Sequence, residues 1–403
     1  MNSTSIFTNT NMLDLTDIAA IDNHCHLPLD EPPPRQAAGL ARFFTEAGHP
    51  RVLAEQTPHS LFFRRAIRDL AAVMGLEGSD IEDQSGNLQI EAVLAKRAEY
   101  EAGDWFRLMI EKANLAALYT DMGYPRSGGW SVEKALDVVK TLNPAPAIHS
   151  ILRIERILED LITESASFDQ CEEAFRQIIR EARGQGAVGL KSIIAYRCGL
   201  DIEPANTSRS LASKSFQVLK AEADRTGTFV RVADKTLLDY IVLVALEEAA
   251  KQELPVQFHT GFGDTDVDLV KANPAYLKPI FENSALQKAP VVLLHCYPYI
   301  QEASYLAAMY PQVYLDFSLS SPLVAYGGGR AIEEALGLAP TTKVLYASDA
   351  WGVPDIIYLG SLHSRKVLTQ VFEKWIGQGW LDEREARQAA LNILQLNSRA
   401  LYQ

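Results

Sequence analysis

Two histidines separated by one residue close the first strongly apolar stretch of the chain. The stretch leads through Asp22 and Asn23 into His24, Cys25 and His26. Side chains alternate between the two faces of a β-strand, so His24 and His26 point the same way in an extended chain. Two imidazoles on one face can bind the same divalent cation. The spacing therefore indicates a metal site at the end of a strand.

Further side chains of the types that bind metals stand at or near the ends of later apolar runs: Lys191, His259, His295 and Asp349. Each alone has an ordinary explanation, such as a hydrogen-bonded structural histidine, a lysine in a buried ion pair, or an aspartate N-cap. Burying such a group without a partner costs several kcal/mol, and a shared cation offsets that cost for all of them. Taken together they predict one metal site, made by His24, His26, Lys191, His259, His295 and Asp349.

Short apolar runs rich in Val, Ile, Leu or Tyr alternate with longer helical patterns, which is typical of a parallel sheet. Eight such units predict a closed (β/α)8 TIM barrel, in which the carboxyl ends of the strands form the mouth where active sites are built. The expected strands span residues 18–27, 115–124, 148–157, 187–196, 255–261, 290–297, 313–320 and 343–349. The expected helices between them span residues 131–141, 168–184, 211–226, 236–252, 275–285, 301–309 and 330–336, and residues 361–403 are expected to be helical.

A long segment, residues 28–114, separates the first two expected strands. It soon reaches Pro32-Pro33-Pro34 and then shows helical patterns over residues 35–47, 60–74 and 89–112. An insertion after a strand lies over the mouth of a barrel, so we interpret it as a helical lid within one domain that spans residues 1–403. A purely decorative or dimer-forming insertion is the alternative.

Composition excludes several classes of partner. The 403 residues carry a formal net charge of −13, and no run is rich in Lys or Arg, which argues against nucleic acid. Residues 1–17 lack the basic start and apolar centre of a signal peptide, and no apolar run is long enough to cross a membrane. The four cysteines show no paired spacing. A reduced, cytoplasmic setting is therefore expected.

The order of the metal-binding residues resembles that of the amidohydrolase superfamily. In that superfamily an H-x-H closes strand one, histidines close strands five and six, and an aspartate closes strand eight. His24, His26, His259, His295 and Asp349 match these positions over nearly the whole chain. The sequences around Lys191, His259 and Asp349 (Gly189-Leu190-Lys191-Ser192, Phe258-His259-Thr260-Gly261-Phe262-Gly263-Asp264 and Ala347-Ser348-Asp349) are similar to the amidohydrolase-2 branch, particularly the domain fused to glutamine-synthetase-like proteins of the FluG type.

The resemblance implies a zinc-dependent hydrolase that cleaves an amide-type C–N bond through hydroxide activated by the metal. Asp349 is expected to accept the proton of the water and pass it to the leaving group, and His295 or a second metal to stabilise the oxyanion. Lys191 decides between one and two zinc ions. A carbamylated Lys191 would bridge two ions; an unmodified Lys191 would leave one ion and would hold a substrate carboxylate or donate a proton.

Substrate-binding residues are expected among the polar and aromatic side chains after the strands: Arg153, Tyr196, Arg197 and Trp351. Arginine suits a small substrate that bears a carboxylate, because its guanidinium binds both oxygens at once. We expect Asp22 and Asn23 to orient the metal-binding histidines. His49, His59, His149 and His363 are expected to be surface or structural residues, although His49 or His59 would reach the mouth if the lid folded over it.

Other functions remain open at this point. The superfamily includes non-hydrolytic members, so a mononuclear zinc decarboxylase or isomerase is the second hypothesis, because fold alone does not choose the reaction. A binding protein that keeps the barrel is a third, although such a protein has no need of Asp349. A small-molecule substrate is expected in the first two cases. Barrels of this size often form homo-oligomers, but no feature of the sequence shows it.

Overall fold

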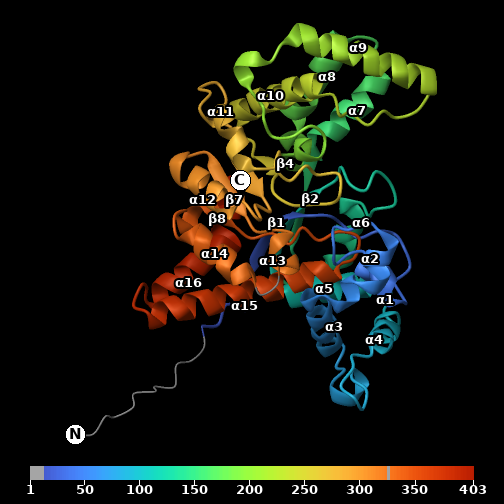
Figure 1. The fold of residues 1–403 in the computed structure, drawn as a ribbon, viewed down its shortest axis with the longest axis vertical. Helices are drawn as coiled ribbons and strands as arrows, with labels where there is room; N and C mark the ends of the chain where they lie inside the picture. The colour runs from blue at the N-terminus through green and yellow to red at the C-terminus, as the bar shows by residue number, and fades with distance from the viewer. Residues whose placement is uncertain (1–12, 325–326) are drawn as a thin grey trace.

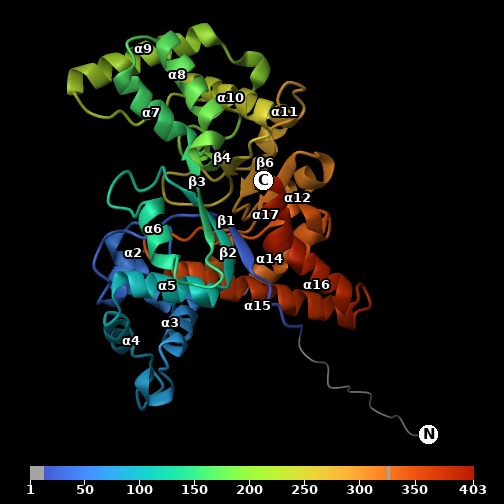
Figure 2. The same ribbon diagram turned by 180° about the vertical axis from the view of Figure 1, so that it is seen from behind.

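The computed structural model describes residues 13–324 and 327–403, and its centre is one sheet of eight parallel strands in sequential order. The expectation that residues 1–17 are not a signal peptide concerns a segment of which residues 1–12 lie outside the described residues. Helices surround the strands (Figures 1 and 2), so the predicted (β/α)8 barrel is confirmed. The strands are β1 (Ala20–Cys25), β2 (Leu115–Asp121), β3 (Ala147–Arg153), β4 (Ala187–Ser192), β5 (Val256–His259), β6 (Val291–Leu294), β7 (Val313–Asp316) and β8 (Val344–Leu345).

The barrel closes between its last and first strands through the chain that follows β8. The Asn23 N–H donates to the Tyr346 carbonyl at 3.0 Å, and the Asp349 N–H donates to the His24 carbonyl at 2.9 Å. Every residue of β1, β5 and β6 is buried, as expected for strands covered on both faces. This closure places Asp349 directly beside the two histidines of β1.

All eight expected strands run past the C-terminal end of the observed strand, and in two of them the extra residues form helices beside the mouth. The third ends at Arg153, and helix α7 (Ile154–Glu164) begins at the next residue, so Glu155 lies on a helix and not on a strand. The fourth ends at Ser192 and gives way to a short 3-10 helix, η4 (Ile194–Tyr196). In α7, apolar residues at helical spacing directly continue the apolar strand, so local composition gave no boundary.

The outer layer contains more helices than the sequence predicted. Two helices instead of one lie between β3 and β4, α7 and α8 (Phe168–Glu181), and these gather with α9 (Arg209–Thr226) and α10 (Lys235–Gln252) at one end of the molecule (Figure 1). None of the helices in the described residues is both long and apolar enough to cross a bilayer. The remaining outer elements are α6 (Val132–Val139), η3 (Arg183–Gln185), η5 (Pro204–Asn206), η6 (Pro274–Leu277), α11 (Lys278–Phe281), α12 (Ile300–Met309), α13 (Ser320–Leu323), α14 (Gly328–Leu336), η8 (Thr341–Lys343), α15 (Asp355–Gly377), α16 (Glu383–Leu391), η9 (Asn392–Leu396) and α17 (Asn397–Tyr402).

The segment expected to form a lid divides into parts with different positions. Its last helix, α5 (Ala102–Ala113), packs against α15 and α6 and is part of the outer ring of the barrel. Its first part approaches the mouth, where Arg42, residues 45–48 and Leu53 line the cavity that also holds the six candidate residues. The other elements are α1 (Ala37–Ala41), α2 (Pro50–Glu55), η1 (Thr57–His59), α3 (Leu61–Val73), η2 (Gly78–Asp80) and α4 (Ile90–Arg97). The single-domain interpretation stays a prediction.

A buried ion pair fastens this insertion to the barrel. Arg97 at the end of α4 donates from Nε and Nη2 to the two carboxylate oxygens of Asp355, at 2.7 and 2.6 Å. Asp355 is the first residue of α15 and also accepts the Trp105 indole N–H at 3.1 Å. Both charged side chains are almost inaccessible, with exposed fractions of 4% and 0%. A carboxylate at a helix N-terminus is further stabilised by the helix dipole.

Replacing one partner of this pair is expected to be costly. Arg97→Met removes the guanidinium and leaves Asp355 buried without its cation, which costs about 3–5 kcal/mol in free energy of unfolding. Urea unfolding followed by circular dichroism measures the change. Arg51→Met is the control, because the Arg51–Glu55 pair is exposed and is expected to be worth less than about 1 kcal/mol. An Arg97→Met protein as stable as the control would show that the pair does not hold the insertion.

Candidate metal centre

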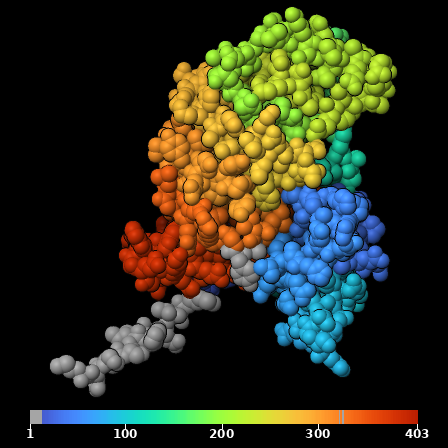
Figure 3. Space-filling view, in the orientation of Figure 1, coloured from blue at the N-terminus to red at the C-terminus, as the bar shows by residue number. Residues whose placement is uncertain are grey.

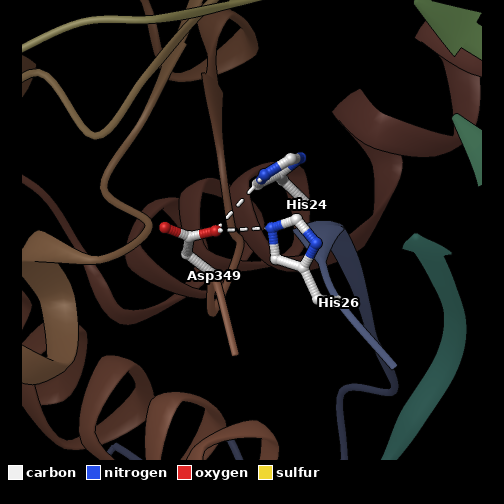
Figure 4. Close-up of side chains that lie close together, drawn as sticks. All are labelled: His24, His26 and Asp349. Carbon is white, nitrogen blue, oxygen red and sulfur yellow. Dashed lines mark ion pairs between the residues drawn. The ribbon is translucent and has the colours of Figure 1, made fainter. Parts of the chain in front are cut away.

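His24, His26 and Asp349 converge at the mouth of the barrel. Nε2 of His24 lies 3.3 Å from Oδ1 of Asp349, and Nε2 of His26 lies 3.7 Å from the same oxygen (Figure 4). One donor atom from each of the three residues lies within 4.8 Å of the others. The H-x-H of β1 and the aspartate after β8 therefore form a compact set of ligands.

His259 and His295 lie on the other side of this set. Their rings are 4.4 Å apart, and the His24 and His295 rings are 6.1 Å apart. Nδ1 of His295 is 3.7 Å from Oδ2 of Asp349, the oxygen that His24 and His26 do not approach. Nε2 of His259 is buried and has no hydrogen-bond partner among the described residues. A buried ring nitrogen without a protein partner is available to bind a cation.

Lys191 completes the predicted set. It lies near the end of β4, is 2% exposed, and lines the same cavity as the four histidines and Asp349. Within the part of the chain that the structure describes, no hydrogen bond or ion pair engages its side chain. The structure thus brings together all six residues that the sequence predicted, while their roles as ligands stay predictions.

Hydrogen bonds on the far side of each ring orient the histidines. Nδ1 of His24 is 2.8 Å from Oε1 of Gln257, and Nδ1 of His26 is 3.2 Å from the Asp121 carbonyl oxygen. These contacts leave Nε2 of both rings directed at Asp349. Such outer contacts are typical of histidines that bind metals.

Asp22 and Asn23 act on the chain around the candidate ligands rather than on a histidine ring, and Asp22 accepts a hydrogen bond from the His24 backbone. Asp22 accepts the Ser348 N–H at 2.9 Å and the Ser348 hydroxyl at 2.6 Å, and so holds the residue before Asp349. Asn23 donates to Asp316 at 3.0 Å. Both residues belong to β1, which lies between β2 and the chain after β8. The linear sequence does not show these neighbours, so it could not predict the partners of the two side chains. The side chain that contacts the His24 ring is that of Gln257.

The backbone is strained at two of the candidate ligands. His295 has φ +68° and Asp349 has φ +51°, in the left-handed region that residues other than glycine rarely occupy. Asp316 holds the first by accepting the His295 N–H at 2.9 Å, and the His24 carbonyl holds the second. Conformations of this kind cost about 1–3 kcal/mol each and gather at functional sites. Asp349 is therefore not a helix N-cap, since α15 begins only at Asp355.

The electrostatics of the site suit a divalent cation. Burial, followed by the neighbouring Lys191, lowers the pKa values of His24 and His259 well below the usual range, and burial lowers that of His295 similarly. Burial also lowers the pKa of Lys191 to about 8. The imidazoles are therefore neutral at physiological pH, which is the form that binds metals. With a carboxylate beside them, these residues fit a divalent cation.

The predicted substrate-binding residues line the same cavity, whose volume is about 420 Å³. Tyr196 packs on His259 with ring centroids 4.2 Å apart, and Trp351 packs on Phe43 of the insertion at 4.9 Å. Arg153 and Arg197 also reach the cavity, but each already contacts a carboxylate. Their binding of substrate stays a prediction.

Sequence reasoning missed two acidic residues of the cavity, Glu46 and Asp266. Glu46 comes from the loop after α1, and burial raises its pKa to about 8. Its sequence neighbourhood shows no motif, so no signal could have found it. His49 caps α2 and His59 is exposed, and neither lines the cavity. His363 contacts Asp69 at 2.9 Å, far along α15, which fits a structural role.

Comparisons with known proteins agree with this geometry. A model of the amidohydrolase family matches residues 169–403, more than half of the chain. FluG of Emericella nidulans is 34% identical over 255 residues, which is 60% of this chain and 29% of FluG. A protein of Lactobacillus casei named as a candidate metal-dependent hydrolase has a structure that superposes with a TM-score of 0.82 at 27% identity, covering 97% of this chain and 98% of that one.

A more distant structural likeness concerns the fold alone. The uronate isomerase of Thermotoga maritima superposes with a TM-score of 0.64 at 12% identity, covering 96% of this chain and 95% of that one.

The barrel and its mouth define a metal-dependent hydrolase fold. The chain belongs to the amidohydrolase family. Fold, family and donor set together imply a divalent metal.

Gln257 is expected to control metal affinity although it is not a ligand. Gln257→Leu removes the acceptor of His24 and also the donor to the Asn23 carbonyl and the Tyr402 hydroxyl, both at 2.7 Å. The metal affinity should fall by about 10–100-fold. Competition with a chromogenic chelator measures it, with near-native circular dichroism as the check on folding. Gln252→Leu, which removes a contact to the Ile179 carbonyl on the outer helices, should leave the affinity unchanged. Equal affinities of the two variants would contradict the assignment.

Proposed function

We propose that this protein is a metal-dependent hydrolase that cleaves an amide-type C–N bond in a small molecule that bears a carboxylate or derives from an amino acid. The observation that carries the proposal is the convergence of His24, His26 and Asp349 with the unpartnered Nε2 of His259 in one cavity. The name of the similar Lactobacillus casei protein supports the metal-dependent hydrolase part of the proposal. Membership of the amidohydrolase family supports an amide-type C–N bond as the bond that is cleaved.

The cation would be held by the donors at the mouth. Zinc is the expected ion, because neutral imidazoles and one carboxylate are its usual ligands. When bound, it lowers the pKa of water to about 7 and polarises the carbonyl group of a substrate. His24, His26 and Asp349 are close enough to share one ion, and His259, His295 and Lys191 line the remaining side.

Asp349 is the proton carrier in this proposal. Its Oδ1 faces His24 and His26, and its Oδ2 faces His295. Of the groups at the mouth it alone is a carboxylate in contact with three histidines, so it can accept a proton from water and return it to the leaving nitrogen. His295 lies where it can stabilise the developing oxyanion.

The substrate and setting are proposed on weaker grounds. The similarity to FluG favours a γ-glutamyl or another amino-acid-derived amide, since the FluG type joins this domain to a glutamine-synthetase-like one. We propose a freely diffusing substrate in the cytoplasm, with neither nucleic acid nor membrane as partner, and assembly of the chain as a homo-oligomer. The described cysteines are all free, as a reducing compartment would leave them.

A decarboxylase or isomerase with one metal is the second candidate. The likeness of the fold to uronate isomerase is the observation that keeps it open. The two candidates differ in product, because hydrolysis of an amide releases ammonia or an amine, decarboxylation releases carbon dioxide, and isomerisation releases neither. Assays of amide and carboxylate libraries with both readouts separate them.

Loss of the metal or of Asp349 is expected to abolish turnover. Asp349→Asn removes the proton acceptor, so kcat should fall by at least about 100-fold. A chelator should remove activity that zinc restores. Asp137→Asn, which alters an exposed pair with Lys140, is the matched control and should keep full activity. Unchanged kcat in the Asp349→Asn protein would refute the hydrolytic mechanism.

Lys191 determines the number of metals. We propose that carbon dioxide carbamylates it, so that its new carboxylate bridges two zinc ions, one on His24, His26 and Asp349 and the other on His259 and His295. Metal analysis of protein prepared with zinc and bicarbonate should then give two zinc ions per chain, and Lys191→Met should reduce this to one or fewer. Full activity with one zinc ion per chain would contradict the bridge and would indicate that Lys191 is not carbamylated.

A further inference from the structure

The arginines of the active-site cavity are already paired with carboxylates. Arg153 donates from Nε and Nη2 to Asp121, at 2.9 and 2.6 Å, and Arg197 lies 3.1 Å from Glu159. Arginines nearer the entrance are paired in the same way, Arg42 with Glu31 and Arg231 with Asp266. None of the four therefore brings an uncompensated positive charge to a ligand.

Two acidic side chains of the same cavity form no ion pair with a cationic side chain of the described residues, although Arg231 acts on Asp264 from a greater distance. Glu46, from the insertion, makes no hydrogen bond or ion pair with any residue that the structure describes. Asp264, after β5, accepts only the Asp266 N–H at 2.8 Å, and no cationic side chain of the described residues lies within ion-pair distance of it. The two groups repel each other when ionised: after burial, the charges of Asp349 and Asp264 raise the pKa of Glu46. Glu46 is partly buried and Asp264 is exposed. Acidic groups without an ion-pair partner at a ligand site favour a cationic ligand, whose charge also favours the ionised form of Glu46.

Aromatic rings line the wall beside these carboxylates. Tyr124 and Trp351 meet edge to face at 5.8 Å, and the ring of Tyr196 stacks beside His259. The faces of such rings attract a protonated amine, most strongly where water is excluded. Carboxylates combined with aromatic rings are the lining that an ammonium group requires, whereas a carboxylate ligand gains nothing from either.

These acidic and aromatic residues line the same cavity as the candidate metal ligands. Glu46 and Asp264 also line a second hollow of about 400 Å³ formed by residues 44–62 and 262–265, so they form the partition between the two spaces. In the space-filling view the blue residues of the insertion lie beside the yellow chain that follows β5 (Figure 3). The buried, unpartnered Nε2 of His259 opens on the same cavity. A ligand held at the partition therefore reaches the metal-binding residues.

We propose that the substrate carries a protonated amine, which Glu46 and Asp264 bind against the rings of Tyr124, Tyr196 and Trp351. This inference rests on the proposed function, which supplies the amide bond that is cleaved. It narrows the substrate class to an amide with a free amino group, such as an amide of an unacylated amino acid. Glu46 is the specificity-determining residue. The paired arginines Arg153 and Arg197 shape the cavity and have a smaller share in recognition than the sequence suggested.

Matched pairs of compounds test this recognition separately from catalysis. The probes are L-glutamine, L-asparagine, γ-glutamylethylamide and glycinamide, each beside its N-acetylated form, which removes only the positive charge and adds an acetyl group. Glutaramic acid, which lacks the amine without gaining bulk, controls for the size of the acetyl group. Calorimetric titration of zinc-loaded protein measures binding, and release of ammonia or ethylamine measures turnover of the same compounds.

Wild-type protein should bind at least one free amine at least about 30-fold more tightly than both its acetylated form and the deaminated analogue, as expected for a desolvated charge pair. Glu46→Gln keeps the shape of the side chain and should reduce this preference to about 3-fold or less, raising KM much more than it lowers kcat. Glu55→Gln, in an exposed pair on α2 of the same insertion, should keep the full preference.

The outcomes distinguish the two proposals. If the preference for free amines depends on Glu46 but no compound is hydrolysed, recognition of an ammonium group stands and the proposed amide hydrolysis fails. If no free amine of the panel binds more tightly than its uncharged partners, or if Glu46→Gln keeps the preference, the inference is overturned, whatever the protein hydrolyses.

Discussion

The cost of withdrawing polar groups from water governs the mouth of this barrel. Four imidazoles, one ammonium and one carboxylate lie there, the histidines and Lys191 each less than 10% exposed. Isolated, each would cost several kcal/mol to bury. Neutral rings directed at a common carboxylate, and a ring nitrogen left without any partner, are stable together only if a cation is shared among them. The architecture around them serves to keep these groups at that one point.

Support for the cluster comes from elements that are far apart in the chain. Gln257 of β5 links His24 to the Asn23 carbonyl and to Tyr402, almost the last residue. Asp316 of β7 accepts the His295 N–H and the Ser318 hydroxyl, so it fixes the strained turn after β6. The barrel thus uses strands on both sides of each ligand to hold it. Distortions of backbone that would be unfavourable in isolation persist because several hydrogen bonds determine them.

Charge pairing divides the cavity into a structural and a functional part. The guanidinium groups of Arg153 and Arg197 are balanced by Asp121 and Glu159, so they stiffen the wall. Glu46 and Asp264 are not balanced, and they belong to segments that approach each other only in the folded protein. Arginine content alone therefore suggested a carboxylate-binding site, whereas the pairing pattern supports the proposed amine. Net charge at a site depends on partners and cannot be counted from residue types.

Local patterns in the sequence determined the eight strand-and-helix units, the H-x-H of the first strand and the polar residues that close strands five, six and eight. These depend on periodicity and on the rule that parallel strands bring their carboxyl ends to one rim, both of which act over short stretches or through a known topology. Only the tertiary structure decided that α7 starts at Ile154, that Gln257 contacts the ring of His24, and that Glu46 enters the cavity. Each of these features depends on which segments meet across the barrel. The cost of removing polar groups from water depends on their neighbours in space, and these can lie far apart along the chain.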